Sequence, residues 1–173
     1  MPLLIDGYNL LNVTGIVGRG VGPGTLDRSR KALLNFIAES IDPAEVPQTT
    51  VVFDAHDAPP GLPRTVTHHG ITVHYASDYE DADELIEELI QAHSAPRSLT
   101  VVSSDHRIHR AAKRRKAQPI DSDRWYAETI RRRAERGQPD AAAEIKPQHK
   151  PSPEEVERWL KVFDGKKKGD MEK

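Results

Sequence analysis

The sequence lacks cysteine, which excludes disulfides and cysteine-based metal sites. It also lacks any stretch near the roughly 20 apolar residues that a membrane helix needs, so we expect no membrane span. No basic region followed by a long apolar run stands at the start, and we expect no secretory signal. The net charge is only −2 over 173 residues, so no sign of charge dominates the whole molecule. Together these absences favour a cytoplasmic protein.

Along the chain, short apolar runs typical of buried strands alternate with segments that have helical spacing. Short apolar runs rich in β-branched residues occupy residues 2–6, 49–55, 71–76 and 98–105, and a weaker run occupies 117–121. Apolar residues at helical spacing occupy 26–40 and 82–93, and two more polar helical segments are expected at 106–116 and 123–134. A proline-rich break at 59–63 indicates a loop. Strands alternating with helices predict an α/β fold with a mainly parallel sheet covered by helices on both faces.

The composition changes after about residue 135. We therefore predict one domain over residues 1–134 and a separate segment over 135–173, which begins as a linker. Residues 152–155 (Ser-Pro-Glu-Glu) form a capping box that starts a short amphipathic helix, with Trp159 and Phe163 on one face. That helix is a candidate docking element for the domain or for a protein partner, and the basic end of the chain is expected to be disordered.

Acidic residues follow several of the predicted strands. Asp6 ends the first, Asp54 ends the second, and Asp105 follows the run that ends near residue 104. Glu80, Asp81 and Asp83 begin the helix after another strand. In an open parallel sheet, ligands bind beyond the carboxyl ends of the strands, so these acids are expected at one edge.

Each acid also has a purely structural interpretation. Asp105, Asp81 and Asp83 suit helix N-termini, and Asp54 suits a turn. The coincidence of four such junctions favours a site, however, because converging carboxylates repel and need a counter-charge. Hard divalent cations such as Mg²⁺ or Mn²⁺ supply one. Gly7 is interpreted as allowing a sharp turn after Asp6 and leaving room near the ion.

Four stretches in this order resemble the YacP-like branch of the NYN family: IDGYNLL near the start, VVFDAH, YEDADELIEELI and VVSSD. NYN domains belong with the PIN-like ribonucleases. The resemblance covers roughly residues 1–130, and it implies a three-layer α/β/α domain and metal-dependent cleavage of RNA. Where the family commonly has Glu-Thr-Ala-Asp, this chain has Asp81 in place of the threonine.

Carried over by matching motif positions, the resemblance implies an acidic site that holds Mg²⁺ or Mn²⁺. The metal ligands and catalytic residues it implies are Asp6, Asp54, Glu80, Asp83 and Asp105, with Asn9 of the DGYN motif as a supporting polar group. Hydrolysis at such a site would leave a 5′-phosphate and a 3′-hydroxyl. That chemistry does not use the ribose 2′-hydroxyl, so the choice of RNA over DNA depends on the resemblance.

The segment from Asp105 to Arg136 is locally basic, with 11 Lys or Arg residues against 5 Asp or Glu. Such residues give non-specific, salt-sensitive affinity for phosphates, although a solvated helix face is the ordinary alternative. The predicted RNA contacts are Arg107, Arg110, Lys113, Arg114, Arg115 and Lys116, with Arg19 from the glycine-rich segment 15–24 and a further contribution from the run 131–133. Tyr8 and Trp125 could stack on bases, but Trp125 is expected in the core.

The sequence thus predicts a metal-dependent endoribonuclease acting on RNA, including the possibility of messenger RNA on the ribosome. A non-catalytic RNA- or ribosome-binding module with the same fold is one alternative. A toxin-like or protein-interaction PIN domain, docking through the helix of Trp159, is another. Eight histidines invite a zinc site, but no third ligand accompanies the pairs at 68–69 and 106/109, so packing roles are favoured.

Overall fold

The computed structural model describes residues 1–16, 25–54, 64–79 and 81–137. The chain divides into two units, Met1–Asp140 and Ala141–Lys173, and all described residues belong to the first. The predicted linker, the helix of Trp159 and the basic end lie outside the described residues, as do Arg19, the proline-rich segment 59–63 and Glu80.

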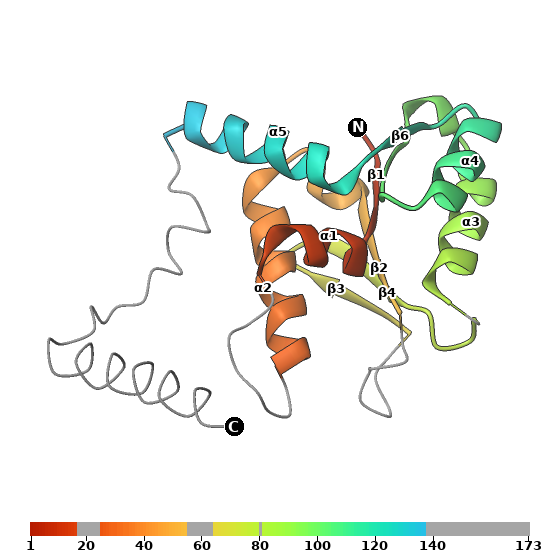
Figure 1. The fold of residues 1–173 in the computed structure, drawn as a ribbon, viewed down its shortest axis with the longest axis horizontal. Helices are drawn as coiled ribbons and strands as arrows, with labels where there is room; N and C mark the ends of the chain where they lie inside the picture. Colours follow the sequence, from red (N-terminus) through yellow and green to blue (C-terminus); the bar gives the residue numbers. More distant parts are fainter. Residues whose placement is uncertain (17–24, 55–63, 80, 138–173) are drawn as a thin grey trace, which may run out of the picture. The chain divides into compact units, whose positions relative to one another are not determined.

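A six-stranded sheet forms the centre of the first unit, in the order β3-β4-β2-β1-β5-β6 (Figure 1). The strands are β1 (Leu3–Asp6), β2 (Thr49–Phe53), β3 (Thr65–His68), β4 (Ile71–Tyr75), β5 (Thr100–Val102) and β6 (Gln118–Ile120). All neighbours are parallel except β3, which pairs antiparallel with β4 at the edge. The predicted mainly parallel α/β fold is confirmed.

Helices cover both faces of the sheet. They are α1 (Gly7–Thr14), α2 (Thr25–Ser40), α3 (Ala82–Ala92), α4 (His106–Arg114) and α5 (Ser122–Glu135), with short 3₁₀ turns η1 (Val46–Gln48) and η2 (Pro96–Ser98). Helices α3 and α4 pack together on one side, while α1 contacts both α2 and α5 on the other (Figure 1). This is the three-layer arrangement that the sequence predicts.

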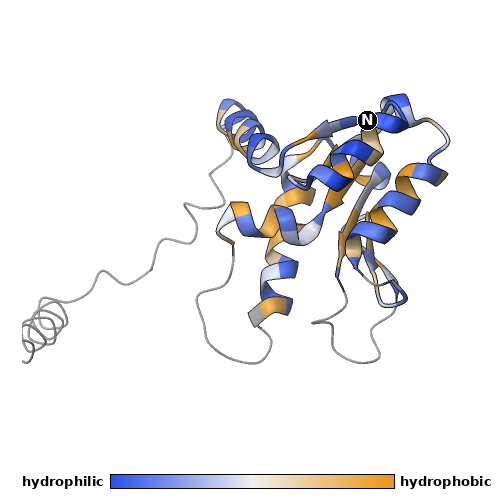
Figure 2. Ribbon diagram, turned by 45° about the vertical axis from the view of Figure 1, so that its right-hand side comes forward, coloured by the Kyte–Doolittle hydropathy of each residue, from blue (hydrophilic) through white to orange (hydrophobic). Residues whose placement is uncertain are grey.

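Alternation along the strands supplies both layers of the core. Leu4, Val52 and Val101 pack with Ile86 and Ile108 beneath α3 and α4. Their strand neighbours point to the opposite face, toward α1, α2 and α5. The apolar strands therefore lie between helices whose outer faces are hydrophilic (Figure 2). The prediction that Trp125 belongs to the core is confirmed, because only 4% of it is exposed.

Two elements were not expected from the sequence. Strand β3 is half-exposed and mixes polar with apolar residues, so it lacks the apolar run that marks the inner strands. Helix α1 begins at the residue immediately after β1, with Asp6 as its N-cap. The segment after Asp6 is thus a helix and not the sharp glycine turn that we predicted.

Gly7 is required for a different reason from the one predicted. A Cβ at this position would lie 2.9 Å from Cζ of Phe53 and closer still to two other carbons of that ring. The absence of a side chain therefore lets the first turn of α1 pack against the aromatic ring at the end of β2.

No helix within the described ranges has both the length and the apolar character needed to cross a membrane.

Candidate active site

The site lies where the chain changes direction across the sheet. After β1 the chain builds β2 and β4 to one side, and it later returns to add β5 and β6 on the other. The point between β1 and β5 is therefore a topological switch point, where parallel α/β sheets form a crevice beyond the strand ends. Asp6 ends β1 there, and Ser103, Ser104 and Asp105 follow β5.

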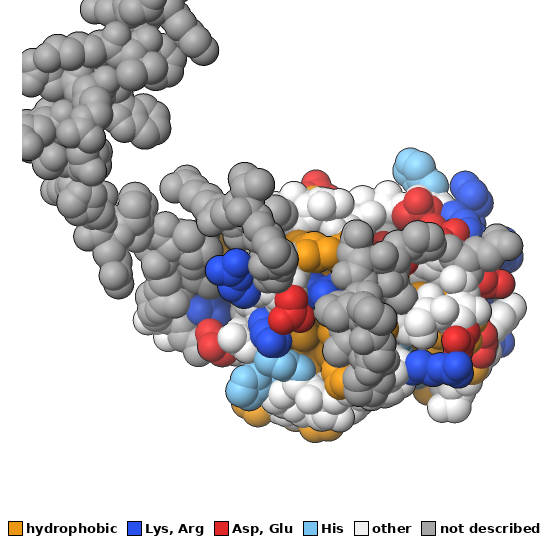
Figure 3. Space-filling view, turned by 90° about the horizontal axis from the view of Figure 1, so that it is seen from below, with side chains coloured by type: hydrophobic (Ala, Val, Ile, Leu, Met, Phe, Trp, Pro, Cys, Tyr) orange, Lys and Arg blue, Asp and Glu red, His pale blue; other side chains and the backbone are white. Residues whose placement is uncertain are grey.

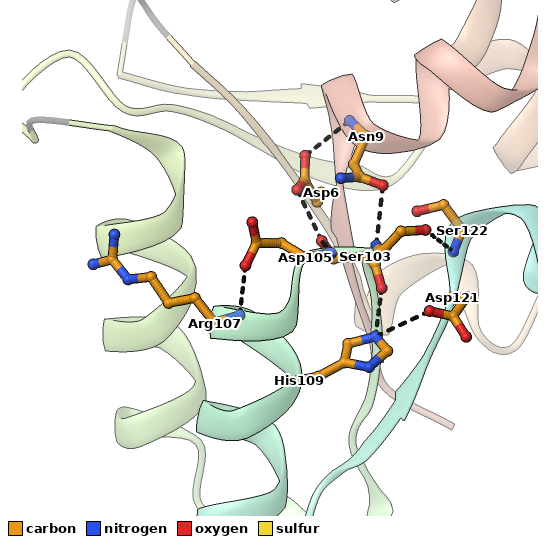
Figure 4. A network of polar contacts seen from close by, with 9 residues as sticks. Asp6, Asn9, Ser103, Asp105, Arg107, His109, Asp121 and Ser122 are labelled. Atoms are coloured by element: carbon orange, nitrogen blue, oxygen red, sulfur yellow. Dashed lines mark hydrogen bonds and ion pairs between the residues drawn. The ribbon is translucent and has the colours of Figure 1, made fainter.

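Ser103 links the two acids of this crevice. Its hydroxyl donates to Oδ2 of Asp6 at 3.0 Å and accepts the backbone N–H of Asp105 at 3.1 Å (Figure 4). The strand register explains this contact: Ile5 pairs with Val102, so the residues that follow them lie side by side. The sequence suggests that Ser103 or Ser104 assists the cap at Asp105, but it contains no sign that Ser103 also bonds to Asp6.

Asp6 and Asp105 also cap helices. Oδ1 of Asp6 accepts the N–H of Asn9 at 3.0 Å at the start of α1, and Oδ1 of Asp105 accepts the N–H of Arg107 at 2.5 Å at the start of α4. The structural interpretation of Asp105 as a cap is thus correct, but it uses only one oxygen. The other oxygen of Asp105 has no hydrogen-bond partner among the described residues and is available to a ligand.

Asn9 joins the loops around the acids. Its Oδ1 accepts the N–H of Ser104 at 3.0 Å, and the hydroxyl of Ser104 accepts the N–H of Ser122 at 3.1 Å (Figure 4). The first turn of α1, the loop that follows β5 and the start of α5 are therefore tied together by two consecutive hydrogen bonds. Asn9, predicted as a supporting polar group, holds the backbone beside Asp105.

His109 supports the same loop from α4. Its Nε2 lies 2.5 Å from the carbonyl oxygen of Ser103 and 3.8 Å from Oδ1 of Asp121. Because a carbonyl only accepts hydrogen bonds, Nε2 carries the hydrogen. His109 therefore holds the backbone carbonyl of Ser103, the residue whose hydroxyl contacts Asp6 and Asp105. This is a structural role and not a zinc-binding one.

Burial and mutual repulsion perturb the carboxylates. Asp6 is 8% exposed, and its pKa is raised chiefly by loss of solvent, against the opposing effect of the Asn9 N–H and the Ser103 hydroxyl. The pKa of Asp83 rises from 3.8 to about 6, first because of burial and then because of the negative charges of Asp105, Asp6 and Asp81. The charges of Asp6 and Asp105 thus reach Asp83, so these three acids share one electrostatic environment.

Arg107 is the cation nearest to this environment. Its Nη1 contacts Oδ2 of Asp81 at 3.2 Å, and its Nε donates to Oε1 of Glu87 at 3.1 Å. Its charge also lowers the pKa of Asp83 slightly. Arg107 therefore joins α4 to α3 and partly balances the acids, whereas the sequence predicts it as an RNA contact.

The residue that departs from the family motif has a structural explanation. Oδ1 of Asp81 accepts the N–H of Glu84 at 2.8 Å, so Asp81 is the N-cap of α3. With Oδ1 in the cap and Oδ2 against Arg107, both oxygens of Asp81 are engaged by the protein. Asp83, in the first turn of the helix, is the acid of this segment whose pKa is affected by the charges of Asp6 and Asp105.

The other predicted residues fall into three groups. Asp54 follows β2 and is half-buried, while Glu80 and Arg19 lie outside the described residues. The exposed cations of α4 are Arg110, Lys113 and Arg114, with Lys116 following the helix and Arg115 half-buried. Arg133 of the basic run is buried, and its Nη1 donates to the Ser40 hydroxyl at 2.8 Å, so that residue cannot bind RNA without leaving the core.

The donor chemistry of the site suits a hard divalent cation, because the converging groups are carboxylate oxygens. Across residues 1–16, 25–54, 64–79 and 81–137, no group of three or more His, Cys, Asp or Glu side chains is arranged to hold a metal ion. Helices α1, α3 and α4 all begin at this site, and their N-termini favour negative charge. A cation or a phosphate would both meet complementary charge here.

Comparison with known proteins agrees with this geometry. The YacP-like NYN domain family matches residues 3–170. The crystal structure of Rae1 (YacP) from Bacillus subtilis is similar at 29% identity, covering 99% of this chain and 97% of that chain with a TM-score of 0.56. A tryptophan-to-leucine mutant of that Bacillus subtilis protein matches at 25% identity over 84% of this chain and 87% of that chain, with a TM-score of 0.55. None of the curated proteins matches. This chain belongs to the YacP-like NYN domain family and has the fold of the PIN-like ribonucleases.

Proposed function

We propose that this protein is a metal-dependent endoribonuclease that hydrolyses RNA at the crevice between β1 and β5. The observation that carries the proposal is the shared electrostatic environment of Asp6, Asp83 and Asp105, which come from three separate elements. Acids whose pKa is raised by burial and by neighbouring negative charges, at the crevice of a parallel sheet, are candidates for a functional site. Family membership supports RNA as the substrate.

In this proposal Asp6, Asp83 and Asp105 hold Mg²⁺ or Mn²⁺, with Asp54 and Glu80 as further ligands. When bound, the ion supplies acidity to an attacking water and charge to the leaving oxygen, giving a 5′-phosphate and a 3′-hydroxyl. Ser103 keeps one oxygen of Asp6 in a fixed direction through its hydroxyl. Asn9 and His109 hold the loop that carries Ser103, so the acids do not have to reorganise when the substrate arrives.

Cations near the site favour a polyanionic substrate. Arg110 is exposed on α4, whose first residue follows Asp105, and exposed Lys113 and Arg114 continue the basic face to the far end of that helix. Seen from below the view of Figure 1, basic and acidic side chains are interspersed on the visible surface (Figure 3). The exposed cations of α4 reduce the repulsion between an RNA strand and the acidic centre.

A cleavage assay with end-labelled RNA tests the proposal. We expect cleavage with Mn²⁺ or Mg²⁺, none in EDTA, and a loss of about 100-fold or more in Asp105→Asn and Asp6→Asn. Asp123→Asn is the matched control, because it removes the same charge from an exposed side chain in the first turn of α5. Full activity of Asp105→Asn, or cleavage that persists in EDTA, would contradict a metal-dependent mechanism.

Two further arms sharpen the result. One outcome is that the protein binds RNA tightly in EDTA and yet cleaves none of the RNAs tested when Mn²⁺ or Mg²⁺ is present. That outcome would favour the non-catalytic binding module. Reactions with messenger RNA on ribosomes, run beside the same RNA alone, test the narrower proposal of a ribosome-associated substrate. The cytoplasmic location stays a prediction, and cell fractionation checks it.

A further inference from the structure

A basic pocket lies at the amino ends of the parallel strands, whereas the acidic site lies at their carboxyl ends. It has a volume of about 490 Å³ and is lined by Arg97 and the two serines Ser94 and Ser98 from the α3–β5 connection, and by Arg114, Arg115 and Lys116 from the end of α4. The turn η2 precedes β5, and the end of α4 precedes β6, so both segments lie at the amino ends of parallel strands. The acidic residues are at the carboxyl ends.

The charge of this pocket is not balanced by the protein. No acidic side chain lines it, and none of its four cations forms an ion pair with any residue that the structure describes. Glu87 lines a smaller hollow beside it, but Oε1 of Glu87 accepts from Arg107. Four converging cations repel one another, and an anion relieves that repulsion.

A helix C-terminus attracts basic residues for its own stability, and this explains Lys113 and Arg114 in the last turn of α4. It does not explain Arg97, which comes from a different element and faces the same pocket. Cations from two separate segments around one hollow suit the binding of phosphate groups.

Lys116 provides an independent observation. The N–H of Lys116 donates to the carbonyl of Lys113 at 3.0 Å, and that of Ala117 donates to the carbonyl of Ala112 at 2.9 Å, which together form a Schellman motif. The left-handed position of this motif usually holds glycine, yet Lys116 occupies it with φ at 63°. Lys116 thus has a long cationic side chain at a backbone conformation that favours glycine, which has no side chain. Local backbone strain of this kind is often found at functional sites.

We propose that this basic pocket binds the phosphate groups of an RNA strand several nucleotides away from the bond that is cut at the acidic site. The inference rests on the proposed ribonuclease function for the identity of the strand. Helix α4 connects the two sites: Asp105 caps its start, and Arg114 to Lys116 end it. Nine residues span about 14 Å, which is about four nucleotide steps of a stacked strand.

Binding of fluorescent RNA in EDTA tests the pocket without cleavage. An RNA of about 2 nucleotides, with one step of about 3.4 Å, cannot reach across the roughly 14 Å from the acidic site to the pocket, whereas one of about 16 nucleotides can. We expect Arg97→Gln and Lys116→Gly each to weaken binding of the long RNA about fivefold, and to lower the slope of log affinity against log salt by about 0.7. Binding of the short RNA and of AMP should change little. Arg115 is left intact because it is half-buried and bonds to the His93 carbonyl.

Arg124→Gln is the matched control. It removes one positive charge from an exposed side chain of α5 that already pairs with Glu128. Unchanged affinity of Arg97→Gln and Lys116→Gly for the long RNA, or an equal loss in the control, would overturn the proposal. An equal loss for AMP would show a mononucleotide site instead, and displacement of RNA by poly-glutamate at matched charge would show a site for acidic proteins.

The outcomes separate this inference from the proposed function. Long-RNA binding that depends on Lys116, together with no cleavage under any metal, supports the pocket and removes the nuclease. If the wild type cleaves RNA but neither pocket variant changes RNA binding, the nuclease is supported and the pocket is removed.

Discussion

Replacing Asp83 with asparagine should stabilise the protein while abolishing its proposed activity. In the fold, burial and then the charges of Asp105 and Asp6 raise the pKa of Asp83 from 3.8 to about 6. A rise of this size corresponds to a cost of at most ~3 kcal/mol for the ionised carboxylate. Asp83 is only half-buried, so solvent screening reduces that cost, and the N-terminus of α3 offsets part of it. We expect a net gain of about 1 kcal/mol for Asp83→Asn near neutral pH.

The stability difference between Asp83→Asn and the wild type should depend on pH. Because the pKa is raised in the fold, Asp83 contributes stability that is fully present below pH 3.8 and is lost as the pH rises through about 6. Asparagine does not titrate. The variant should therefore exceed the wild type most above pH 6, and the difference should shrink as the pH falls toward 3.8.

Thermal unfolding in EDTA measures this difference. For a chain of this length, a gain of about 1 kcal/mol corresponds to a rise in Tm of about 3 °C. Asp123→Asn removes the same charge from an exposed position and should give no such rise. If Asp83→Asn melts at or below the wild-type temperature above pH 6, or if its advantage does not shrink at lower pH, the pKa of Asp83 is not raised by the fold and the reasoning fails.

Adding Mn²⁺ should reverse the order of stability. A ligand that binds only the folded protein raises its Tm in proportion to its affinity, and the proposed site needs the Asp83 carboxylate. The wild type should therefore gain stability from Mn²⁺ while Asp83→Asn gains little. A gain of the same size in both proteins would remove Asp83 from the ligand set.

Three other substitutions test separate contacts. Gly7→Ala should lower the free energy of unfolding by ~2 kcal/mol in urea titrations, because its methyl group overlaps the Phe53 ring, and adding Phe53→Leu should recover part of the loss; a neutral Gly7→Ala would refute the overlap. Ser103→Ala should lower the free energy of unfolding by ~2 kcal/mol and remove most RNA cleavage, because Asp6 loses a buried hydrogen-bond donor. Ser103→Thr keeps the hydroxyl and should retain more stability and more cleavage. Equal effects of the two substitutions would show that the hydroxyl is unimportant. Lys116→Gly should raise stability by ~1 kcal/mol, seen as a higher Tm, and a lower Tm would mean that the left-handed backbone carries no strain.

The elements that the sequence predicted correctly are those with a strong periodic signal. The runs that became β1, β2, β4 and β5 are nearly continuous in apolar residues because helices cover both of their faces. The amphipathic segments that became α2 and α3 are likewise evident from spacing alone. Edge strand β3 and the short helix α1 were missed, since β3 has one exposed face and α1 starts within the motif that we interpreted as a turn.

The candidate site could be predicted only in part. That acids gather at the carboxyl ends of strands follows from the order of elements along the chain, and Asp6 and Asp105 were found in this way. Ser103 was expected only as an aid to the Asp105 cap, and the roles of Ser103 at Asp6 and of His109 at the loop were not predicted. Ser103 meets Asp6 only because β1 pairs with β5, two strands that are almost a hundred residues apart in the sequence. His109 reaches the Ser103 carbonyl from the first turns of α4, and this contact depends on how α4 packs beside the loop.

The sequence by itself determined the layers of this protein, the edge at which its acids lie and its family, because apolar periodicity and short motifs are local properties of the chain. Only the tertiary structure decided what each charged group meets. Arg133 became a core residue, Arg107 a link between α3 and α4, and the end of α4 one wall of a basic pocket. The physical reason is that electrostatic energy depends on distance and burial in space, which separation along the chain does not specify.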